Sequence, residues 1–304
     1  MHISRVRHNR RRGLHFSDIK RISRQIDTSV LWFSKRQLNI PLQSYMAIKI
    51  KTPKQIEGIR KSAHLASKCL KHLEAFVKPG ITTKELDSIA SYFMKEHNAT
   101  SATIGYKGHG VQPFSGHICT SVNDVICHGV PNDYTLKDGD ILNIDVTTIL
   151  DGFFGDTCRM YAIGSISDEA QKLMDVTKEC LKIGLSQCFP GSRFGNIGFE
   201  ISEYAHKEGY NVVYEFCGHG VGLQFHEDPE VSHIAYKNTG KRMRPGMIFT
   251  IEPMINTGKA RSKVDTTDGW TARTIDGGLS AQYEHTILIT EDGCEAMTDL
   301  FGDY

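Results

Sequence analysis

Four acidic residues stand inside or at the edge of strongly apolar, strand-like runs of the chain: Asp145, Asp156, Glu252 and Glu284. An ionised carboxylate on the inner face of a sheet loses its hydration, and it is tolerated only when it is paired, protonated or bound to a cation. No Lys or Arg recurs on the same strand faces to neutralise the four. Any single one could lie at a strand end and face solvent, but four at matching positions predict a site for divalent metal ions.

A nitrogen ligand for such a site is offered by His219, which lies in the glycine-rich run Cys217–Gly222. Glycine lets other groups approach the backbone closely. Two Asp, two Glu and one His form an oxygen-rich ligand set, which suits Mn, Fe, Co or Zn and argues against copper or an iron–sulfur cluster. Two such ions roughly 3.5–4 Å apart would lower the pKa of a bridging water and polarise a carbonyl. The residues therefore predict metal-assisted hydrolysis.

Two further histidines stand beside Gly or Pro in loop-like contexts, His128 in Cys127–Pro131 and His226 in Phe225–Pro229. Taken singly, each is more often a surface or helix-capping histidine. Beside a metal site, each would instead hydrogen-bond the substrate carbonyl or amide as charge develops in the transition state.

The elements that position these residues occur twice past Met46, and such internal repetition is informative about the fold. In the first half, helical spacing of apolar residues from Ile56 to Val77 ends at Pro79-Gly80. Thr82 and Glu85 have capping-box spacing and open a second helix that runs through about His97. Two extended stretches follow, at about residues 141–148 and 156–163.

The second half repeats this order. Ser167 is placed to cap a helix through about Cys188, and Pro190-Gly191 stops it. Another helix covers about residues 196–208. Strand-like runs follow at Ile248–Ile255 and Tyr283–Thr290.

Side chains alternate along a strand, so each predicted strand has two different faces. Leu142, Ile144 and Val146 share one apolar face, and the polar residues at 143, 145 and 147 share the other. Glu252 likewise shares a face with Thr250, opposite Phe249 and Ile251. We therefore predict an α+β fold: one domain with pseudo-two-fold symmetry, a curved antiparallel sheet inside and helices on the outer face.

Composition places the chain in a broad class only. It has 304 residues, 39% hydrophobic and 23% charged, which is ordinary for a soluble globular protein. It contains no long apolar run and no secretory signal, so we expect no membrane span and a cytoplasmic protein. Eight scattered cysteines without a C-x-x-C pair are expected to be reduced thiols.

The first 45 residues differ from the rest in charge. They carry eight Arg and two Lys against two Asp, a net charge of +8, which leaves −7 for the remainder. Such a basic head could be an organelle transit segment or a nucleic-acid-binding arm. We favour an extension without a structural role, with Met46 as the natural start, and we expect a catalytic domain over residues 46–304.

Six strings of residues resemble the type I methionine aminopeptidases, whose shared architecture is called the pita-bread fold. The strings are Ser121–Pro131, Asp138–Thr147, Gly155–Thr157, Cys217–Gly222, Thr250–Met254 and Ser280–Thr286, within a resemblance that runs from about Met46 to Asp299. The resemblance implies a monomeric exopeptidase with a dinuclear metal centre that activates a bridging water. Its substrates would be nascent polypeptides with an N-terminal Met and a small second residue, met near the ribosomal exit site.

The resemblance also implies roles for single residues. Asp145 would chelate one metal, Asp156 and Glu284 would bridge both, and His219 and Glu252 would bind the other. Glu252 would shuttle the proton of the bridging water.

Further roles concern the substrate. His226 would contact the scissile amide, and His128 would stabilise the tetrahedral intermediate or the leaving amine. The methionine side chain would be lined by Tyr106, Cys119, Phe225 and Trp270. A monovalent cation would bind at Asn123, Val125 and Ser280.

One segment departs from the family pattern, because Lys107–His117 is longer than the usual link between the pocket tyrosine and Cys119. It adds His109, Phe114 and His117 near the expected pocket rim.

Other readings remain on the same fold. A prolidase or aminopeptidase P would carry a substantial preceding domain, and a type II enzyme would need a long insertion between Glu252 and Glu284, where thirty-one residues lie. A non-catalytic pita-bread binding protein would have lost ligands or histidines, and none is missing here.

Overall fold

The computed structural model describes residues 48–108 and 112–302. The expectations for the basic head, for a start at Met46 and for His109 therefore fall outside the described residues. All eight cysteines are free thiols, as expected. Among the helices described, none is long and apolar enough to cross a membrane.

Three of the four helices described begin at a residue whose side chain caps them. Thr52 and Gln55 form a capping box at the start of the first helix, Thr82 and Glu85 form another at the second, and Ser167 caps the third by accepting the backbone N–H of Ala170. The helices are α3 (Pro53–Glu74), α4 (Thr83–Glu96), α5 (Asp168–Ser186) and α6 (Phe194–Lys207).

Two helix boundaries differ from the prediction. Helix α3 ends at Glu74 instead of continuing to Val77, because the backbone N–H groups of Phe76 and Val77 both turn back to the carbonyl of Leu73. Helix α6 begins at Phe194, two residues before the predicted start, and it has no side-chain cap that the sequence could have signalled.

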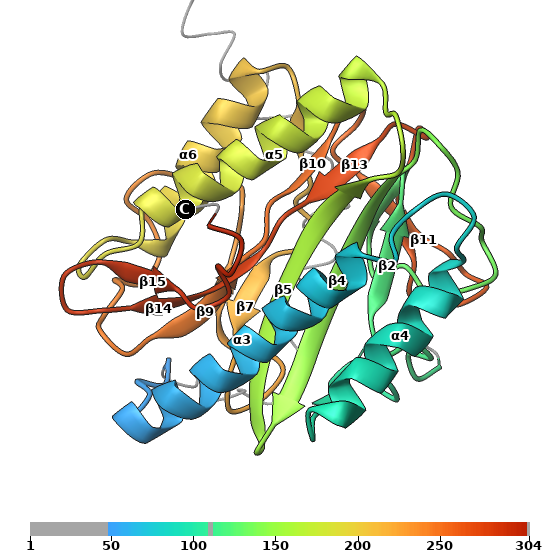
Figure 1. The fold of residues 1–304 in the computed structure, drawn as a ribbon. Helices are drawn as coiled ribbons and strands as arrows, with labels where there is room; N and C mark the ends of the chain where they lie inside the picture. Colours follow the sequence, from blue (N-terminus) through green and yellow to red (C-terminus); the bar gives the residue numbers. More distant parts are fainter. Residues whose placement is uncertain (1–47, 109–111, 303–304) are drawn as a thin grey trace, which may run out of the picture. The chain divides into compact units, whose positions relative to one another are not determined.

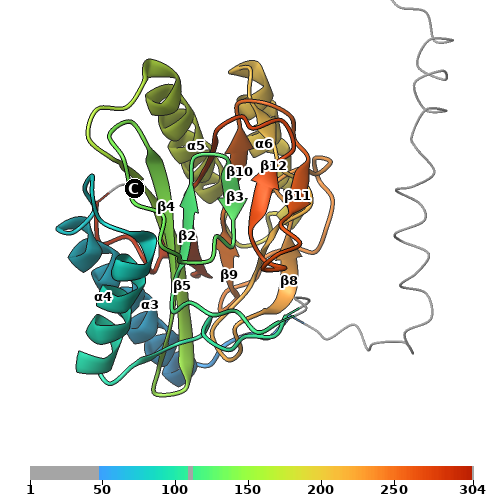
Figure 2. The ribbon, with the colours of Figure 1, turned by 90° about the vertical axis from the view of Figure 1, so that its right-hand side faces the viewer.

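The strands pair antiparallel throughout the described residues, in four hydrogen-bonded sheets instead of one continuous sheet. Figure 2 shows β2 beside β4, with β3 of the small β11–β12–β3 sheet next to β2. The strands are β1 (Thr100–Ser101), β2 (Cys119–Val122), β3 (Val125–Cys127), β4 (Ile141–Leu150), β5 (Phe153–Ala162), β6 (Asn211–Val212), β7 (Gly218–Gly220), β8 (Glu227–Val231), β9 (Ile248–Ile251), β10 (Met254–Asn256), β11 (Ser262–Val264), β12 (Ala272–Thr274), β13 (Ser280–Gln282), β14 (His285–Ile289) and β15 (Cys294–Ala296).

The predicted strand over 248–255 is wrong in one respect, because it divides at Glu252-Pro253. Proline has no N–H to donate to a ladder, so pairing stops there and resumes with a different partner. Strand β9 pairs with β14, whereas β10 pairs with β13 and β6. Glu252 and Glu284 both lie just outside the β9–β14 ladder, whose last pair is Ile251 with His285.

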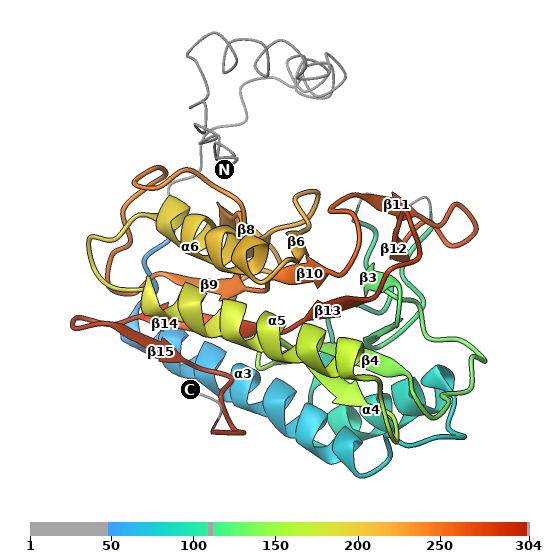
Figure 3. The same ribbon diagram turned by 90° about the horizontal axis from the view of Figure 1, so that it is seen from above.

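Each half of the chain covers its strands with its own pair of helices, as the repeat predicts. The even-numbered apolar residues of β4, from Leu142 to Val146, are buried in one core with α3 and α4. Phe249 and Ile251 of β9 are buried in a second core with α5 and α6. In Figure 1 both helix pairs lie on the same side of the strands, and Figure 3 shows α5 running along β13. The opposite strand faces are left for polar residues.

Helix α3 packs directly on the backbone of β5 beside Asp156. A Cβ added at Gly155 would collide with backbone atoms of Ser62 and Ala63 in α3. Ser62 Oγ also donates to the Thr148 carbonyl at 3.0 Å, and Thr148 Oγ1 donates to the Ser62 carbonyl at 2.9 Å.

We therefore expect Gly155→Ala to lower the free energy of unfolding by about 1–3 kcal/mol, the usual range for overpacking. Gly293→Ala is the control, because nothing lies within 4 Å of a Cβ at Gly293. Urea unfolding of both variants measures the difference. Equal stabilities would contradict the close packing of α3 on β5.

Candidate metal centre

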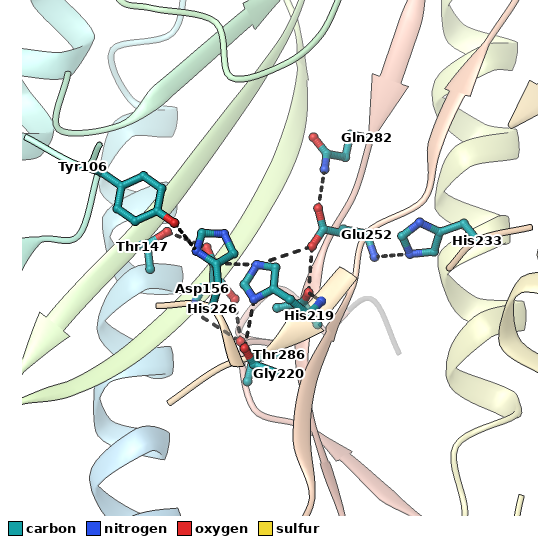
Figure 4. Close-up of polar contacts among 11 residues, drawn as sticks. Tyr106, Thr147, Asp156, His219, Gly220, His226, His233, Glu252, Gln282 and Thr286 are labelled. Carbon is teal, nitrogen blue, oxygen red and sulfur yellow. Dashed lines mark hydrogen bonds and ion pairs between the residues drawn. The ribbon is translucent and has the colours of Figure 1, made fainter. Parts of the chain in front are cut away.

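Three of the five predicted metal ligands converge in space, one from each of three distant segments. Asp156, His219 and Glu284 offer ligand atoms that all lie within 4.8 Å of one another. His219 Nε2 lies 3.6 Å from Asp156 Oδ2 and 3.8 Å from Glu252 Oε1. Figure 4 shows His219 between the carboxylates of Asp156 and Glu252.

Strand register accounts for this convergence. On β4 and β5, Asp145 pairs with Cys158 and Thr147 pairs with Asp156, so the two acidic residues lie on neighbouring strands two residue positions apart in register. Glu252 directly follows β9, and Glu284 directly precedes β14, which pairs with β9. His219 lies on β7, whose Gly220 pairs with Phe249 of β9. Each proposed ligand therefore lies on a paired strand or directly next to one.

The four carboxyl groups have raised pKa values. Burial is the largest cause for each, and it raises the pKa of Asp156 to about 7. The pKa values of Asp145, Glu252 and Glu284 lie well above the ordinary range, because repulsion from neighbouring carboxylates of the group adds to burial. One carboxylate oxygen, Asp145 Oδ1, is buried with no hydrogen-bond donor among the described residues.

A divalent cation fits this group of residues. It would supply the positive charge that four close, buried carboxylates lack, and an acceptor such as Asp145 Oδ1 has a free lone pair for it. The donor set of carboxylate oxygens and one imidazole nitrogen suits first-row divalent ions.

The imidazole of His219 is held in the form that a metal requires. Its Nδ1 lies 3.0 Å from the Gly220 carbonyl oxygen, so Nδ1 carries the proton and Nε2 keeps its lone pair toward the carboxylates. Burial is the main cause that lowers the pKa of His219 to about 4, so the ring is neutral at pH 7.

Hydroxyl groups, which the sequence analysis missed, orient the carboxylates. Thr147 Oγ1 donates to Asp156 Oδ1 at 2.7 Å, and Thr250 Oγ1 donates to Glu252 Oε1 at 2.7 Å. Gln282 Nε2 donates to the second Glu252 oxygen at 3.2 Å. Thr147 lies two residues after Asp145 and Thr250 two residues before Glu252, and this spacing from an acidic residue was the available signal.

His233 is another residue that sequence patterns did not single out. It is buried, and its Nε2 accepts the backbone N–H of Glu252 at 3.1 Å. Its Nδ1 has no partner among the described residues, and burial lowers the pKa of His233 to about 3. A neutral His233 thus fixes the backbone that carries Glu252.

The two predicted substrate histidines lie next to the carboxylate group. The ring centroids of His219 and His226 are 4.2 Å apart, and His226 Nδ1 lies 3.1 Å from the Tyr106 hydroxyl oxygen. His128 packs edge-on against Phe216, and burial lowers its pKa to about 4. Its proximity is one of the smaller causes of the low His219 pKa.

The residues predicted to line the methionine side chain form an aromatic group beside His226. Ring centroids of Tyr106 lie 5.0 Å from Phe225 and 6.2 Å from Trp270. Cys119 lies on β2 in register with Asp145 and is buried. Tyr106 and Phe225 therefore border His226, Cys119 borders Asp145, and Trp270 joins the group through Tyr106.

The described residues 112–114 of the long 107–117 segment lie against Trp270. Phe114 is buried with its ring edge-on to Trp270 at 5.5 Å, and Trp270 Nε1 donates to the Gln112 carbonyl at 2.8 Å. His117 lies beside Asp87 of α4, with Nδ1 3.0 Å from Asp87 Oδ2. Gln112 and Phe114 therefore hold Trp270, one member of the aromatic group.

The residues predicted for a monovalent cation are also close together. The Asn123 carbonyl oxygen accepts the backbone N–H of Ser280 at 2.9 Å, and β13, which begins at Ser280, packs against β3, which begins at Val125. The Ser280 hydroxyl is buried and has no hydrogen-bond partner among the described residues.

Comparison with known proteins defines the class. Residues 57–291 match the model of metallopeptidase family M24, and the chain belongs to this family.

Within that family the chain belongs with the methionine aminopeptidases. It is 48% identical over 255 residues to "Methionine aminopeptidase" of Escherichia coli strain K12, covering 83% of this chain and 94% of the relative. A crystal structure of methionine aminopeptidase from Rickettsia prowazekii is 44% identical and has a TM-score of 0.80, with 83% of this chain and all of that chain covered. These likenesses confirm the predicted α+β pita-bread fold.

The alternative assignment to a prolidase gains support for the fold alone. A prolidase from Pyrococcus furiosus has a TM-score of 0.65 at 21% identity, and the match covers 94% of this chain and 74% of the prolidase.

The raised carboxyl pKa values predict how stability depends on pH. A carboxyl group with a raised folded-state pKa stabilises the fold at low pH, and this contribution is lost as the pH rises through the folded pKa, about 7 for Asp156. The buried histidines have lowered pKa values, so their contribution is complete above about pH 6.5. We therefore expect the melting temperature with EDTA to fall between pH 6.5 and 8.5.

Saturating Mn²⁺ should reverse this loss, raising the melting temperature more at pH 8.5 than at pH 6.5, with about 2–4 °C expected for each kcal/mol. Thermal unfolding followed by circular dichroism measures both series. A Mn²⁺ effect of the same size at both pH values would argue against uncompensated carboxylates.

Proposed function

We propose that this chain hydrolytically removes the N-terminal methionine from nascent polypeptides whose second residue is small. The observation that carries the proposal is the group of Asp156, His219 and Glu284, whose ligand atoms lie within 4.8 Å, with His226 and Tyr106 directly beside it. Similarity to the methionine aminopeptidase of Escherichia coli supports the choice of substrate.

The centre is proposed to hold two divalent ions, Mn, Co, Fe or Zn. Asp145 would bind one ion, Asp156 and Glu284 would lie between both, and His219 and Glu252 would bind the other. When bound, the ions supply Lewis acidity and lower the pKa of a bound water. The spacing of the carboxylates on neighbouring strands and the neutral His219 support this assignment.

Glu252 is proposed to move the proton from the attacking water to the leaving amine. Burial raises the pKa of its carboxyl group, which favours uptake of a proton from the water. Thr250 and Gln282 hold its two oxygens, and His233 holds its backbone, so the carboxylate is oriented before the substrate binds.

The histidines and aromatic residues are proposed to bind the substrate. His226, oriented by the Tyr106 hydroxyl, contacts the scissile amide, and His128 stabilises the charge that develops on the carbonyl or the leaving amine. Phe225, Trp270 and the buried Cys119 contact the methionine side chain, whose thioether packs favourably on aromatic rings.

The remaining assignments are proposals of the same kind. The enzyme acts as a monomer in the cytoplasm and meets its substrates near the ribosomal exit site. A monovalent cation binds at Asn123, Val125 and Ser280, which is supported by their proximity and by the unpaired Ser280 hydroxyl.

Activity is tested with the purified chain supplied with Mn²⁺ or Co²⁺. We expect release of free methionine from the peptide Met-Ala-Ser, and Glu252→Ala should lower kcat at least about 10³-fold, since it removes both a proton carrier and a proposed ligand. Glu291→Ala, at an exposed acidic residue, should leave kcat unchanged. A chain that releases no methionine but cleaves X-Pro dipeptides would overturn the proposal.

The number of ions is tested by metal analysis. After dialysis against excess Mn²⁺, we expect two ions per wild-type chain and one per Asp145→Asn chain, because Asp145 serves only one ion. Inductively coupled plasma mass spectrometry measures the ratio. One ion in both proteins would contradict a dinuclear centre.

A further inference from the structure

Lys51 is a buried lysine close to the candidate site. It is 4% exposed, although a lysine is rarely buried unless it is paired. Its Nζ donates to Glu227 Oε2 at 2.8 Å, and the two side chains are only 1% and 4% exposed. Its backbone N–H donates to the Gly246 carbonyl at 2.8 Å, so main chain and side chain are both held.

The second oxygen of Glu227 holds a turn. Glu227 Oε1 accepts the backbone N–H groups of Leu223 at 2.7 Å and Gln224 at 3.1 Å. The two residues between this turn and Glu227 are Phe225 and His226, whose rings lie beside His219 and Tyr106. One carboxylate thus connects Lys51 to the loop 223–226.

Burial of the Lys51–Glu227 ion pair costs desolvation free energy, and a gain in stability is not a sufficient reason for it. A buried ion pair is often no more stabilising than a pair of apolar residues of similar size, so its benefit is better sought in geometry. Burial raises the pKa of Glu227, but hydrogen bonds from Lys51, Leu223 and Gln224 together outweigh it and keep the pKa below the ordinary value. Glu227 therefore remains a charged acceptor with fixed partners.

We propose that residues 48–51, here called the N-terminal strap, position His226 and Phe225 for catalysis through the Lys51–Glu227 pair. Lys51 is a positioning residue, because it touches neither substrate nor the carboxylate group and acts through Glu227. Ile48 packs against the core under α5 and α6 and anchors the start of the strap. The proposal rests on the proposed peptidase activity for its kinetic test, and amide exchange tests it independently.

The test uses the full chain loaded with Mn²⁺ and compares matched lysine variants. Lys51→Met keeps the length of the side chain and removes its charge, and Lys51→Arg restores a charge. Lys49→Met is the control, because the Lys49 side chain is 43% exposed and its Nζ lies 4.0 Å from the same Glu227 oxygen. The measurements are kcat and KM on Met-Ala-Ser, and hydrogen–deuterium exchange of the segment 221–227.

For Lys51→Met we expect kcat/KM to fall at least tenfold and the amides of Leu223 and Gln224 to exchange faster, with the bound Mn²⁺ unchanged. Lys51→Arg should recover most of the loss, and Lys49→Met should stay within twofold of wild type. A Lys51→Met enzyme within twofold of wild type, or equal effects of the two Met variants, would overturn the proposal. Exchange does not need a substrate, so it decides the role of the strap even if no methionine is released.

A second variant is needed in case Lys51→Met misfolds, because that change leaves the buried charge of Glu227 without its lysine partner. Lys51→Met combined with Glu227→Gln removes both charges while keeping an oxygen for the turn. We expect this double variant to fold and to lose kcat/KM about as much as Lys51→Met, since both changes break one connection. Two results would contradict the connection. One is wild-type kcat/KM in the double variant, and the other is a loss equal to the product of the losses measured for Lys51→Met and Glu227→Gln singly.

Discussion

Repulsion among buried carboxylates is the constraint on which the rest of this structure depends. Burial raises the pKa values of all four carboxyl groups, and repulsion from neighbouring carboxylates raises those of Asp145, Glu252 and Glu284 further. Left to itself, such a group would spread apart or take up protons. It is held together because each member is fixed by the backbone of a paired strand or of the residue next to one, so the ladders of β4–β5 and β9–β14 oppose the repulsion.

The two-fold repetition of the chain explains how each half contributes two acidic residues to this group. Each half supplies a strand pair, a helix pair over its apolar face and two acidic residues on its other face. Thr147 and Thr250 play the same part in the two halves, each donating to a carboxylate. The helices bury the apolar face, and that burial fixes which face the carboxylates occupy, since a shift of one residue in register would exchange the faces.

Much of this could be predicted because it is local or periodic. Alternation placed Asp145 opposite Leu142 and Ile144, and capping residues located the starts of α4 and α5. The break of β9 at Pro253 was readable from the missing N–H and was overlooked. His233 and Lys51 left no such signal, because their partners, Glu252 and Glu227, are nineteen and 176 residues away in the chain. A buried polar pair of that separation is created by the tertiary fold and has no period in the sequence.

The same distinction separates the ligands from the residues that orient them. The acidic residues are conspicuous in sequence because a charge in an apolar strand is expensive, whereas a threonine or a histidine in the same place is unremarkable until its partner is known. Yet the orientation of Glu252 depends on three such residues, Thr250, Gln282 and His233. Because metal binding to a preformed site is also folding free energy, the groups that preform this site determine how much of the repulsion a bound cation must offset. Neutral residues outside the proposed ligand set would thus contribute to the affinity for a bound cation.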